Sequence, residues 1–166
     1  AWDTERISGG SSSGSAVAVA LGLVDAALGT DTAGSGRVPA ALNGIVGVKP
    51  TRGLVPATGV VPACRSLDCV TVFARELRLA RGLAETMAGP DAGDPLSREP
   101  VAMPGLGATP RVAVPTPEHL TGLAPGWRDA FDVVVAGLER TGAEIVHEEY
   151  APQATTDFTA PAERRR

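Results

Sequence analysis

The sequence predicts an α/β fold on three observations. Segments with a helical spacing of apolar residues alternate along the chain with short apolar segments typical of strands. The composition, 43% hydrophobic and 20% charged residues, is that of a globular domain rather than a disordered chain. The length of 166 residues, without internal repeats, suits one domain with a sizeable core.

The elements of the first half are separated by Gly and Pro residues. The run AVAVALGLV is continuously apolar and Ala-rich, which favours a buried helix, and Asp25 ends it. The pieces after it are too short and too often interrupted for long helices. We therefore expect, in order, a helix at 16–24, a strand at 25–30, a short helix at 38–43 ended by Gly44, and strands and loops at 45–63.

The second half continues this alternation. Residues 67–87 indicate a strand followed by a helix, whereas recurring Gly and Pro at 89–110 predict a long loop, which we interpret as a connection inside the fold. Trp127, Phe131 and Leu138 fall at helical spacing. The remaining expected elements are a strand at 111–116, a helix at 127–138 with Gly142 placed to end it, a strand at 144–150 and a tail without periodicity at 151–166.

Charge and cysteine usage restrict the partners and the compartment. The net charge of −4 predicts no basic patch, so we expect no nucleic-acid partner. The longest apolar run, 16–24, is too short to span a bilayer, and no secretory signal is visible.

Cys64 and Cys69 have no histidine near them in sequence, which argues against a metal site. We interpret them as two reduced thiols in a cytoplasmic protein, with a local disulfide as the alternative. The chain begins at Ala1 rather than Met, so we expect its true start to lie upstream.

Residues 9–16 read GGSSSGSA, which alone would be typical of a flexible linker. A linker joins two folded units, yet only eight residues precede this tract. The tract also leads directly into the apolar helix, whose start supplies unpaired N–H groups. We therefore predict that Gly9 to Ser15 is an ordered, largely buried loop leading into a helix.

A second serine with unusual neighbours is Ser35, in the segment TDTAGSGR. Glycines on both sides leave its hydroxyl uncrowded, and they allow successive backbone N–H groups to point toward one anion. A nucleophile beside such donors is the arrangement that acyl transfer requires.

Other interpretations of these segments are weaker. Residues 29–35 follow the glycine spacing of a phosphate-binding loop, but Ser35 stands where that loop needs a lysine. Residues 10–14 fit the G-x-S-x-G elbow with Ser12 as the nucleophile, but the segment before them is a poor strand. His119 and His147 are each a candidate base, although a lone histidine is usually structural or on the surface.

The stretch GGSSSGSAVAVALGLVDAALGTDTAGSGRVPAALNGIVGVKPTRG resembles the signature of the amidase signature family almost throughout. The resemblance is specific, because two serine motifs occur in order inside a matching apolar framework. The continuation LVPATGVVPACRSLDCVTVFA is most similar to the allophanate hydrolase branch, and looser similarity extends to about Tyr150. The resemblance implies that 1–150 is an inner part of a longer amidase signature domain and that 151–166 is a non-matching tail, either disordered or frameshifted.

The resemblance also implies a fold and a catalytic unit. The fold is a mixed β-sheet core flanked by helices, and the catalytic unit is Ser–Ser–Lys. Ser35 matches the nucleophile, and Ser11 matches the bridging serine, whose peptide bond from Gly10 is cis in the family. The other matched positions are the oxyanion hole, formed by the backbone N–H groups of Thr32, Ala33, Gly34 and Ser35, and the supporting residues Ser12 and Arg37.

The resemblance places the third member of this unit outside the chain. Lys49 is the sole lysine, but it matches a lysine of the signature that is not the catalytic one, and we interpret it as structural. The catalytic lysine of the family lies upstream of the Gly/Ser tract. We therefore expect the chain alone to be inactive.

The implied reaction is the hydrolysis of a small-molecule amide through an acyl-enzyme, without a metal or an organic cofactor. For allophanate the products are ammonia and carbon dioxide. The alternatives are a general amidase, the amidase component of a tRNA-dependent amidotransferase and a non-enzymatic remnant. We expect no membrane partner, and we expect the intact protein either to form a homodimer or to associate with a urea carboxylase.

Overall fold

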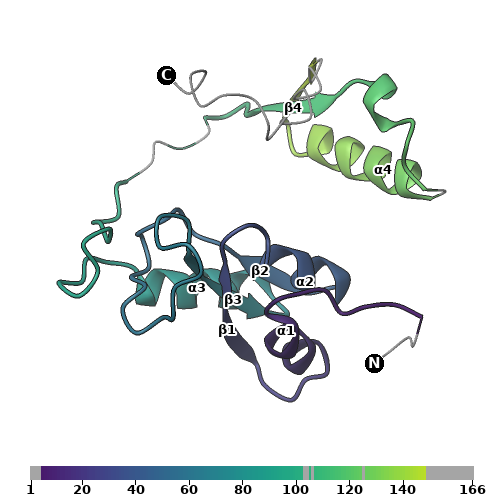
Figure 1. The fold of residues 1–166 in the computed structure, drawn as a ribbon. Helices are drawn as coiled ribbons and strands as arrows, with labels where there is room; N and C mark the ends of the chain where they lie inside the picture. The colour runs from purple at the N-terminus through teal and green to yellow at the C-terminus, as the bar shows by residue number, and fades with distance from the viewer. Residues whose placement is uncertain (1–4, 103–104, 106, 125, 149–166) are drawn as a thin grey trace, which may run out of the picture. The chain divides into compact units, whose positions relative to one another are not determined.

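The computed structural model describes residues 5–102, 105, 107–124 and 126–148. They form two compact units that divide between Ala102 and Met103, and each unit is described by itself (Figure 1). The expectation that 89–110 connects parts of one domain spanning 1–150 stays a prediction. The expected tail at 151–166 lies outside the described residues.

The first unit is built on a three-stranded sheet whose central strand, β3, runs antiparallel to β1 on one side and to β2 on the other. The register places Asp31, the last residue of β1, opposite Cys69, the first residue of β3. Every residue of β3 is buried, so this strand forms the centre of the unit. The elements in chain order are α1 (Ser13–Ala20), β1 (Ala26–Asp31), α2 (Arg37–Leu42), β2 (Val46–Val48), β3 (Cys69–Ala74) and α3 (Leu77–Met87).

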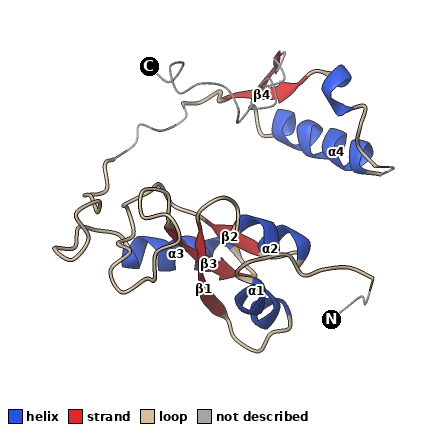
Figure 2. Cartoon of the chain, viewed as in Figure 1, coloured by secondary structure: helices blue, strands red, loops and turns tan. Residues whose placement is uncertain are grey.

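Helices cover both faces of this sheet (Figure 2). The side chains of β3 alternate between two cores, because successive residues of a strand point to opposite faces. Phe73 points toward α1 and α2, whereas Val72 points toward α3. Most helix residues in these cores are alanines, which let the helices lie close to the strands. The buried residues are Ala16, Val19, Ala40 and Phe73 in the first core and Val72, Ala74, Ala80 and Ala84 in the second.

The second unit is a single β–α–β motif. Its strands, β4 (Arg111–Pro115) and β5 (Glu144–Glu148), pair in parallel. They are connected by a short 3₁₀ helix, η1 (Pro117–Leu120), and by α4 (Trp127–Arg140). Gly142 follows α4 at a φ of 90°, and its N–H donates to the Glu139 carbonyl at 2.9 Å. The expected helix and its glycine stop are confirmed.

The predicted α/β class is confirmed, with antiparallel pairs in the first unit and a parallel pair in the second. The first helix differs from its expected bounds of 16–24. It begins inside the Gly/Ser tract at Ser13 and ends at Ala20, because Gly22 adopts a φ of 71° that stops it. The apolar run therefore predicted a helix that ends later than the observed one. Leu21 and Leu23 follow the helix and are exposed.

The Gly/Ser tract leads into α1 and is hydrogen-bonded to β1, as expected for an ordered loop. The expectation that it is largely buried is wrong. None of residues 9–15 is fully buried, and Gly10, Ser11 and Gly14 are exposed. The tract contacts β1, the loop of Ser35 and, at Gly9, the Pro39 backbone of α2, and these contacts leave Gly10, Ser11 and Gly14 exposed.

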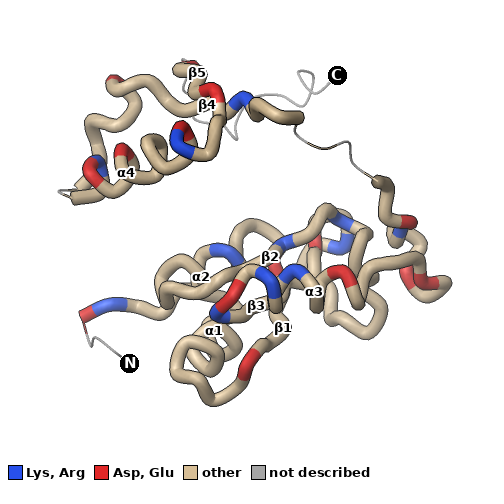
Figure 3. Tube along the Cα trace, turned by 180° about the vertical axis from the view of Figure 1, so that it is seen from behind, with Lys and Arg blue, Asp and Glu red and all other residues tan. Residues whose placement is uncertain are grey.

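Charged residues of both signs are interspersed along the first unit (Figure 3). Several of them form ion pairs, such as Arg75 with Asp25 at 3.3 Å and Arg81 with Glu85 at 2.6 Å. No helix in the described part of the chain has the length and apolar character needed to cross a membrane. Cys69 is buried, and its thiol and that of Cys64 are free.

Gly47 lies where β2 passes α2, and a Cβ atom there would stand 2.7 Å from the Ala40 Cβ. We predict that Gly47→Ala lowers the free energy of unfolding by about 1–3 kcal/mol, because overpacking forces α2 away from the sheet. Gly82→Ala is the matched control, since the space around Gly82 in α3 is open and Ala favours helix by up to about 1 kcal/mol. Urea unfolding followed by circular dichroism measures both variants. Equal midpoints would contradict the close packing of α2 against β2.

Candidate active site

The two serine motifs of the sequence meet in the first unit. Ser11 lies just before α1, and Ser35 lies in the loop that connects β1 to α2. The backbone N–H of Ser12 donates to the carbonyl of Ser35 at 3.3 Å, which joins the two motifs directly. The peptide bond between Gly10 and Ser11 is cis, as the resemblance implies.

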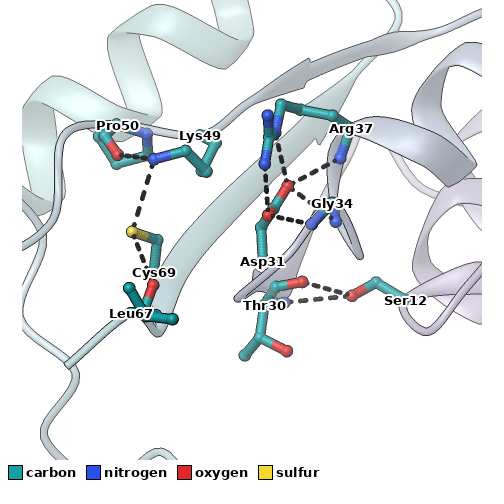
Figure 4. Close-up of polar contacts among 10 residues, drawn as sticks. Ser12, Thr30, Asp31, Gly34, Arg37, Lys49, Pro50, Leu67 and Cys69 are labelled. Atoms are coloured by element: carbon teal, nitrogen blue, oxygen red, sulfur yellow. Dashed lines mark hydrogen bonds and ion pairs between the residues drawn. The ribbon is translucent and has the colours of Figure 1, made fainter. Parts of the chain in front are cut away.

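Ser12 connects the tract to the edge of the sheet as well. Its hydroxyl donates to the Thr30 carbonyl at 3.1 Å and accepts from the Thr30 N–H at 3.1 Å (Figure 4). Gly29 makes this approach possible, because a Cβ atom there would stand within 2.7 Å of the Ser12 side chain and the Phe73 ring. Ser12 therefore holds the segment of Ser11 against the strand that leads to Ser35, and its role as a supporting residue of catalysis stays a prediction.

The loop around Ser35 is organised by Asp31, a residue that the sequence analysis did not single out. The Asp31 side chain has no exposed surface, and its carboxylate accepts the N–H groups of Gly34 at 2.7 Å, Gly36 at 3.1 Å and Arg37 at 3.1 Å. The Arg37 guanidinium also donates to both carboxylate oxygens, each at 2.9 Å (Figure 4). The loop thus folds around one buried negative charge.

Only one sequence signal pointed to this arrangement. An Asp followed by a glycine three residues later is a common turn pattern, because its carboxylate can accept nearby backbone N–H groups. That pattern does not show burial, and burial is what makes Asp31 the centre of the loop. Arg37, expected as a supporting residue, acts on the loop through this carboxylate.

The protonation state of Asp31 follows from these contacts. The Arg37 guanidinium, helped by the backbone N–H groups of Arg37, Gly36 and Gly34, holds the pKa of Asp31 well below its ordinary value, although burial acts in the opposite direction. In turn, Asp31 raises the pKa of Arg37. The pair is therefore ionised throughout the neutral range, and the loop keeps its anchor there.

Asp31 narrows the set of oxyanion donors. The N–H of Gly34 was expected in the oxyanion hole, but it donates to Asp31 Oδ1 at 2.7 Å and is directed to the interior. The backbone N–H groups of Thr32, Ala33 and Ser35 are not among the donors to Asp31, so they remain as candidates for holding a developing negative charge.

Lys49 lies near the site but has other partners. Its ammonium donates to the Pro50 carbonyl at 2.9 Å and lies 3.6 Å from the Cys69 sulfur (Figure 4). Within the described residues it makes no hydrogen bond to Ser11 or Ser35. These contacts support the interpretation of Lys49 as structural.

The resemblance predicts that the Ser11 and Ser35 hydroxyls lie within hydrogen-bond reach of each other. No hydrogen bond joins the two hydroxyls in the described part of the chain, and a proton relay between them stays a prediction. The candidate base His119 belongs to the second unit, where its Nδ1 lies 2.9 Å from the Thr116 hydroxyl. His147 is exposed on β5. Among the described residues, no three His, Cys, Asp or Glu side chains are grouped to hold a metal ion.

Asp31 gives the site a defined pH response. Because its pKa is lower in the folded state than its ordinary value of 3.8, it stabilises the fold above about pH 4, and this contribution fades as the pH falls through the folded value. We predict that Asp31→Asn lowers the free energy of unfolding at pH 7 by on the order of 2 kcal/mol, a figure reduced for the exposed position of Arg37. The difference from wild type should shrink at pH 3.

Urea unfolding at pH 7, 4 and 3 measures this prediction. Asp25→Asn is the control, because the Asp25 side chain is 91% exposed in its pair with Arg75 and should matter little at any pH. A loss for Asp31→Asn that is the same at pH 7 and pH 3 would show that its charge is not the anchor.

Comparisons with known proteins show which family the chain resembles. The profile of the family described as Amidase matches residues 1–158. The urea amidolyase of Saccharomyces cerevisiae is 45% identical over 154 residues, which cover 92% of this chain and 8% of that protein. A glutamyl-tRNA(Gln) amidotransferase component of Symbiobacterium thermophilum is 45% identical over 151 residues, which cover 87% of this chain and 31% of that protein.

Solved structures give the same result. A variant of Kluyveromyces lactis allophanate hydrolase matches with a TM-score of 0.80 at 43% identity, covering 90% of this chain and 25% of that one. The corresponding glutamyl-tRNA(Gln) amidotransferase component of Thermotoga maritima matches with a TM-score of 0.80 at 38% identity, covering 89% of this chain and 34% of that one. The chain thus spans about a third or less of each of these relatives. By sequence and by structure, the chain belongs to the amidase family of enzymes.

Proposed function

We propose that this chain is part of an amide hydrolase that forms an acyl-enzyme on Ser35, with allophanate as its substrate. The observation that carries the proposal is the junction of the two serine motifs, where the Ser12 N–H meets the Ser35 carbonyl beside a loop fixed by Asp31. A nucleophile held on a fixed loop with free backbone donors suits acyl transfer.

In the proposed reaction the Ser35 hydroxyl attacks the amide carbonyl and forms a bond to its carbon. Its proton passes to the Ser11 hydroxyl, which hands its own proton to a lysine outside these 166 residues. The N–H groups of Thr32, Ala33 and Ser35 stabilise the oxyanion. The lysine then returns this proton through Ser11 to the amide nitrogen, so that collapse of the tetrahedral intermediate breaks the C–N bond and expels ammonia. Water attacks the acyl carbon next, its proton passes along the same relay to the Ser35 oxygen, and the acyl group leaves with a carboxylic acid in place of the ester bond. For allophanate the end products are ammonia and carbon dioxide.

Two observations support allophanate over other amides. The segment CRSLDC resembles the allophanate hydrolase branch, and proteins named urea amidolyase and allophanate hydrolase are 43–45% identical to this chain. The intact enzyme would then associate with a urea carboxylase or form a homodimer. The free thiols of Cys64 and Cys69 suit a reducing compartment such as the cytoplasm.

A second candidate is the amidase component of a tRNA-dependent amidotransferase. It is favoured by the relatives named as glutamyl-tRNA(Gln) amidotransferase components, which reach 45% identity over 151 residues. The substrate distinguishes this candidate from an allophanate hydrolase, because the amidotransferase component would release ammonia from glutamine rather than from allophanate. A general amidase would accept simple amides, and a non-enzymatic remnant would turn over none of them.

We predict that the 166-residue chain alone does not release ammonia from allophanate at an enzymatic rate. Ser35 is a weak nucleophile unless a base finally holds its proton, and Lys49 is bonded elsewhere. A longer parent chain that restores the upstream lysine should be active, and Ser35→Ala in that parent should lower kcat at least about a thousand-fold. Coupled ammonia detection with allophanate, glutamine and a simple amide measures the reaction.

Ser13→Ala in the parent chain is the matched control, since Ser13 is in the same tract but its hydroxyl makes no hydrogen bond among the described residues. It should retain activity within about two-fold. Robust turnover by the short chain, lost on Ser35→Ala, would refute the predicted inactivity. If Lys49→Ala also abolished that turnover, Lys49 would be the base.

A further inference from the structure

A second buried carboxylate, that of Asp68, touches the loop of Ser35 from the other side. Thr32 and Asp68 lie one position beyond the last pair of the β1–β3 ladder, Asp31 with Cys69. The Thr32 hydroxyl donates to Asp68 Oδ1 at 2.5 Å. This hydrogen bond joins the first residue of the loop to the turn that precedes β3.

Asp68 is itself held firmly. The residue is 5% exposed, and its carboxylate also accepts the backbone N–H groups of Ala63 at 3.0 Å and Cys64 at 3.0 Å. The Thr32 hydroxyl, followed by the Cys64 and Ala63 groups, keeps the pKa of Asp68 below its ordinary value. At neutral pH the group is therefore an anion that only accepts, and the hydrogen of the Thr32 hydroxyl must point to it.

The carboxylates of Asp31 and Asp68 bind different parts of the loop of Ser35. Asp31 takes the N–H groups of Gly34, Gly36 and Arg37, which lie around and after Ser35. It takes nothing from Thr32, where the loop begins. Asp68 supplies the missing attachment, so the segment between Thr32 and Gly34 is fixed at both ends.

We propose that Asp68 is a positioning residue for the oxyanion hole and acts through the Thr32 hydroxyl. This inference rests on the proposed function, because it assumes that the backbone N–H groups of Thr32, Ala33 and Ser35 meet the developing charge. Fixing the Thr32 side chain fixes the orientation of its peptide groups before the substrate arrives. Such preorganised donors stabilise the transition state more than the ground state, so the contribution should appear in kcat.

A simpler role for Asp68 is to shape the turn at 63–68, since two of its acceptor contacts lie inside that turn. Thr32 distinguishes the two roles. Thr32→Val keeps the size and the branching of the side chain but removes the donor to Asp68, and it leaves the contacts of Asp68 with Ala63 and Cys64 in place. A structural role of Asp68 alone would not make kcat depend on the Thr32 hydroxyl.

The test uses the longer parent chain and compares Thr32→Val, Asp68→Asn and their combination, with allophanate as substrate. We expect Thr32→Val to lower kcat about ten-fold, equal to about 1.4 kcal/mol of activation free energy, with KM changed less than about two-fold. Asp68→Asn should lower kcat at least as much. The double variant should be no worse than Asp68→Asn, because both changes remove the same hydrogen bond. Thr32→Ser, which keeps the hydroxyl, should restore most of kcat.

Matched controls are Thr86→Val and Asp91→Asn. Thr86 donates to the Gly82 carbonyl within α3, and Asp91 accepts the Gly93 N–H in an exposed turn, so neither contact reaches the loop of Ser35. Both variants should keep kcat within about two-fold. Unfolding midpoints measured in urea identify variants that lose activity only because they unfold, and Thr32→Val remains informative if Asp68→Asn does not fold.

The outcomes separate this inference from the proposed function. If Ser35→Ala abolishes turnover while folded Thr32→Val keeps the wild-type kcat, Asp68 has no positioning role and the proposed function stands. Additive losses in the double variant would overturn the inference in the same way. If Ser35→Ala retains turnover, the proposed function fails and this inference fails with it.

Discussion

The buried carboxylate of Asp31 is the constraint around which the first unit is arranged. A buried anion is tolerated only when donors surround it, and here backbone N–H groups and one guanidinium do so. Two of those N–H groups, from Gly36 and Arg37, belong to the start of α2, where a helix leaves its first N–H groups without partners. One side chain at the end of β1 therefore ends the strand, shapes the loop and begins the next helix.

Close backbone approach is the second condition that the site depends on. Gly36 follows Ser35, and a Cβ atom at Gly36 would stand 2.5 Å from the Thr71 side chain of β3. The loop of Ser35 thus lies directly on the central strand, and the absence of a side chain at Gly36 allows this. Within the tract that resembled a flexible linker, Gly9 has a similar effect, because a Cβ atom there would stand 2.9 Å from the Pro39 Cα atom of α2.

Much of the fold could be predicted from the sequence, because its elements are marked by local signals. The alternation of helices and strands and the stop of α4 at Gly142 depend on periodicity and on single residues, and the structure has them. The end of α1 was missed because apolar character does not show where Gly22 turns the chain. The burial of the Gly/Ser tract was misjudged because exposure depends on which segments pack against it.

The candidate site was predictable only in part. Ser11 and Ser35 could be named from motifs, whereas Asp31 and Asp68 could not, because their importance comes from burial and from partners distant in sequence.

The hydroxyls of Ser12 and Ser15 have a consequence for aggregation. Within the described residues β1 is an edge strand, and an exposed edge offers its unpaired N–H and carbonyl groups to strands of other molecules. Ser12 occupies both groups of Thr30, and Ser15 donates to the Leu28 carbonyl at 2.7 Å, so these groups are already taken. The tract that brings Ser11 to the site therefore also leaves fewer backbone groups at Leu28 and Thr30 open to strands of other molecules.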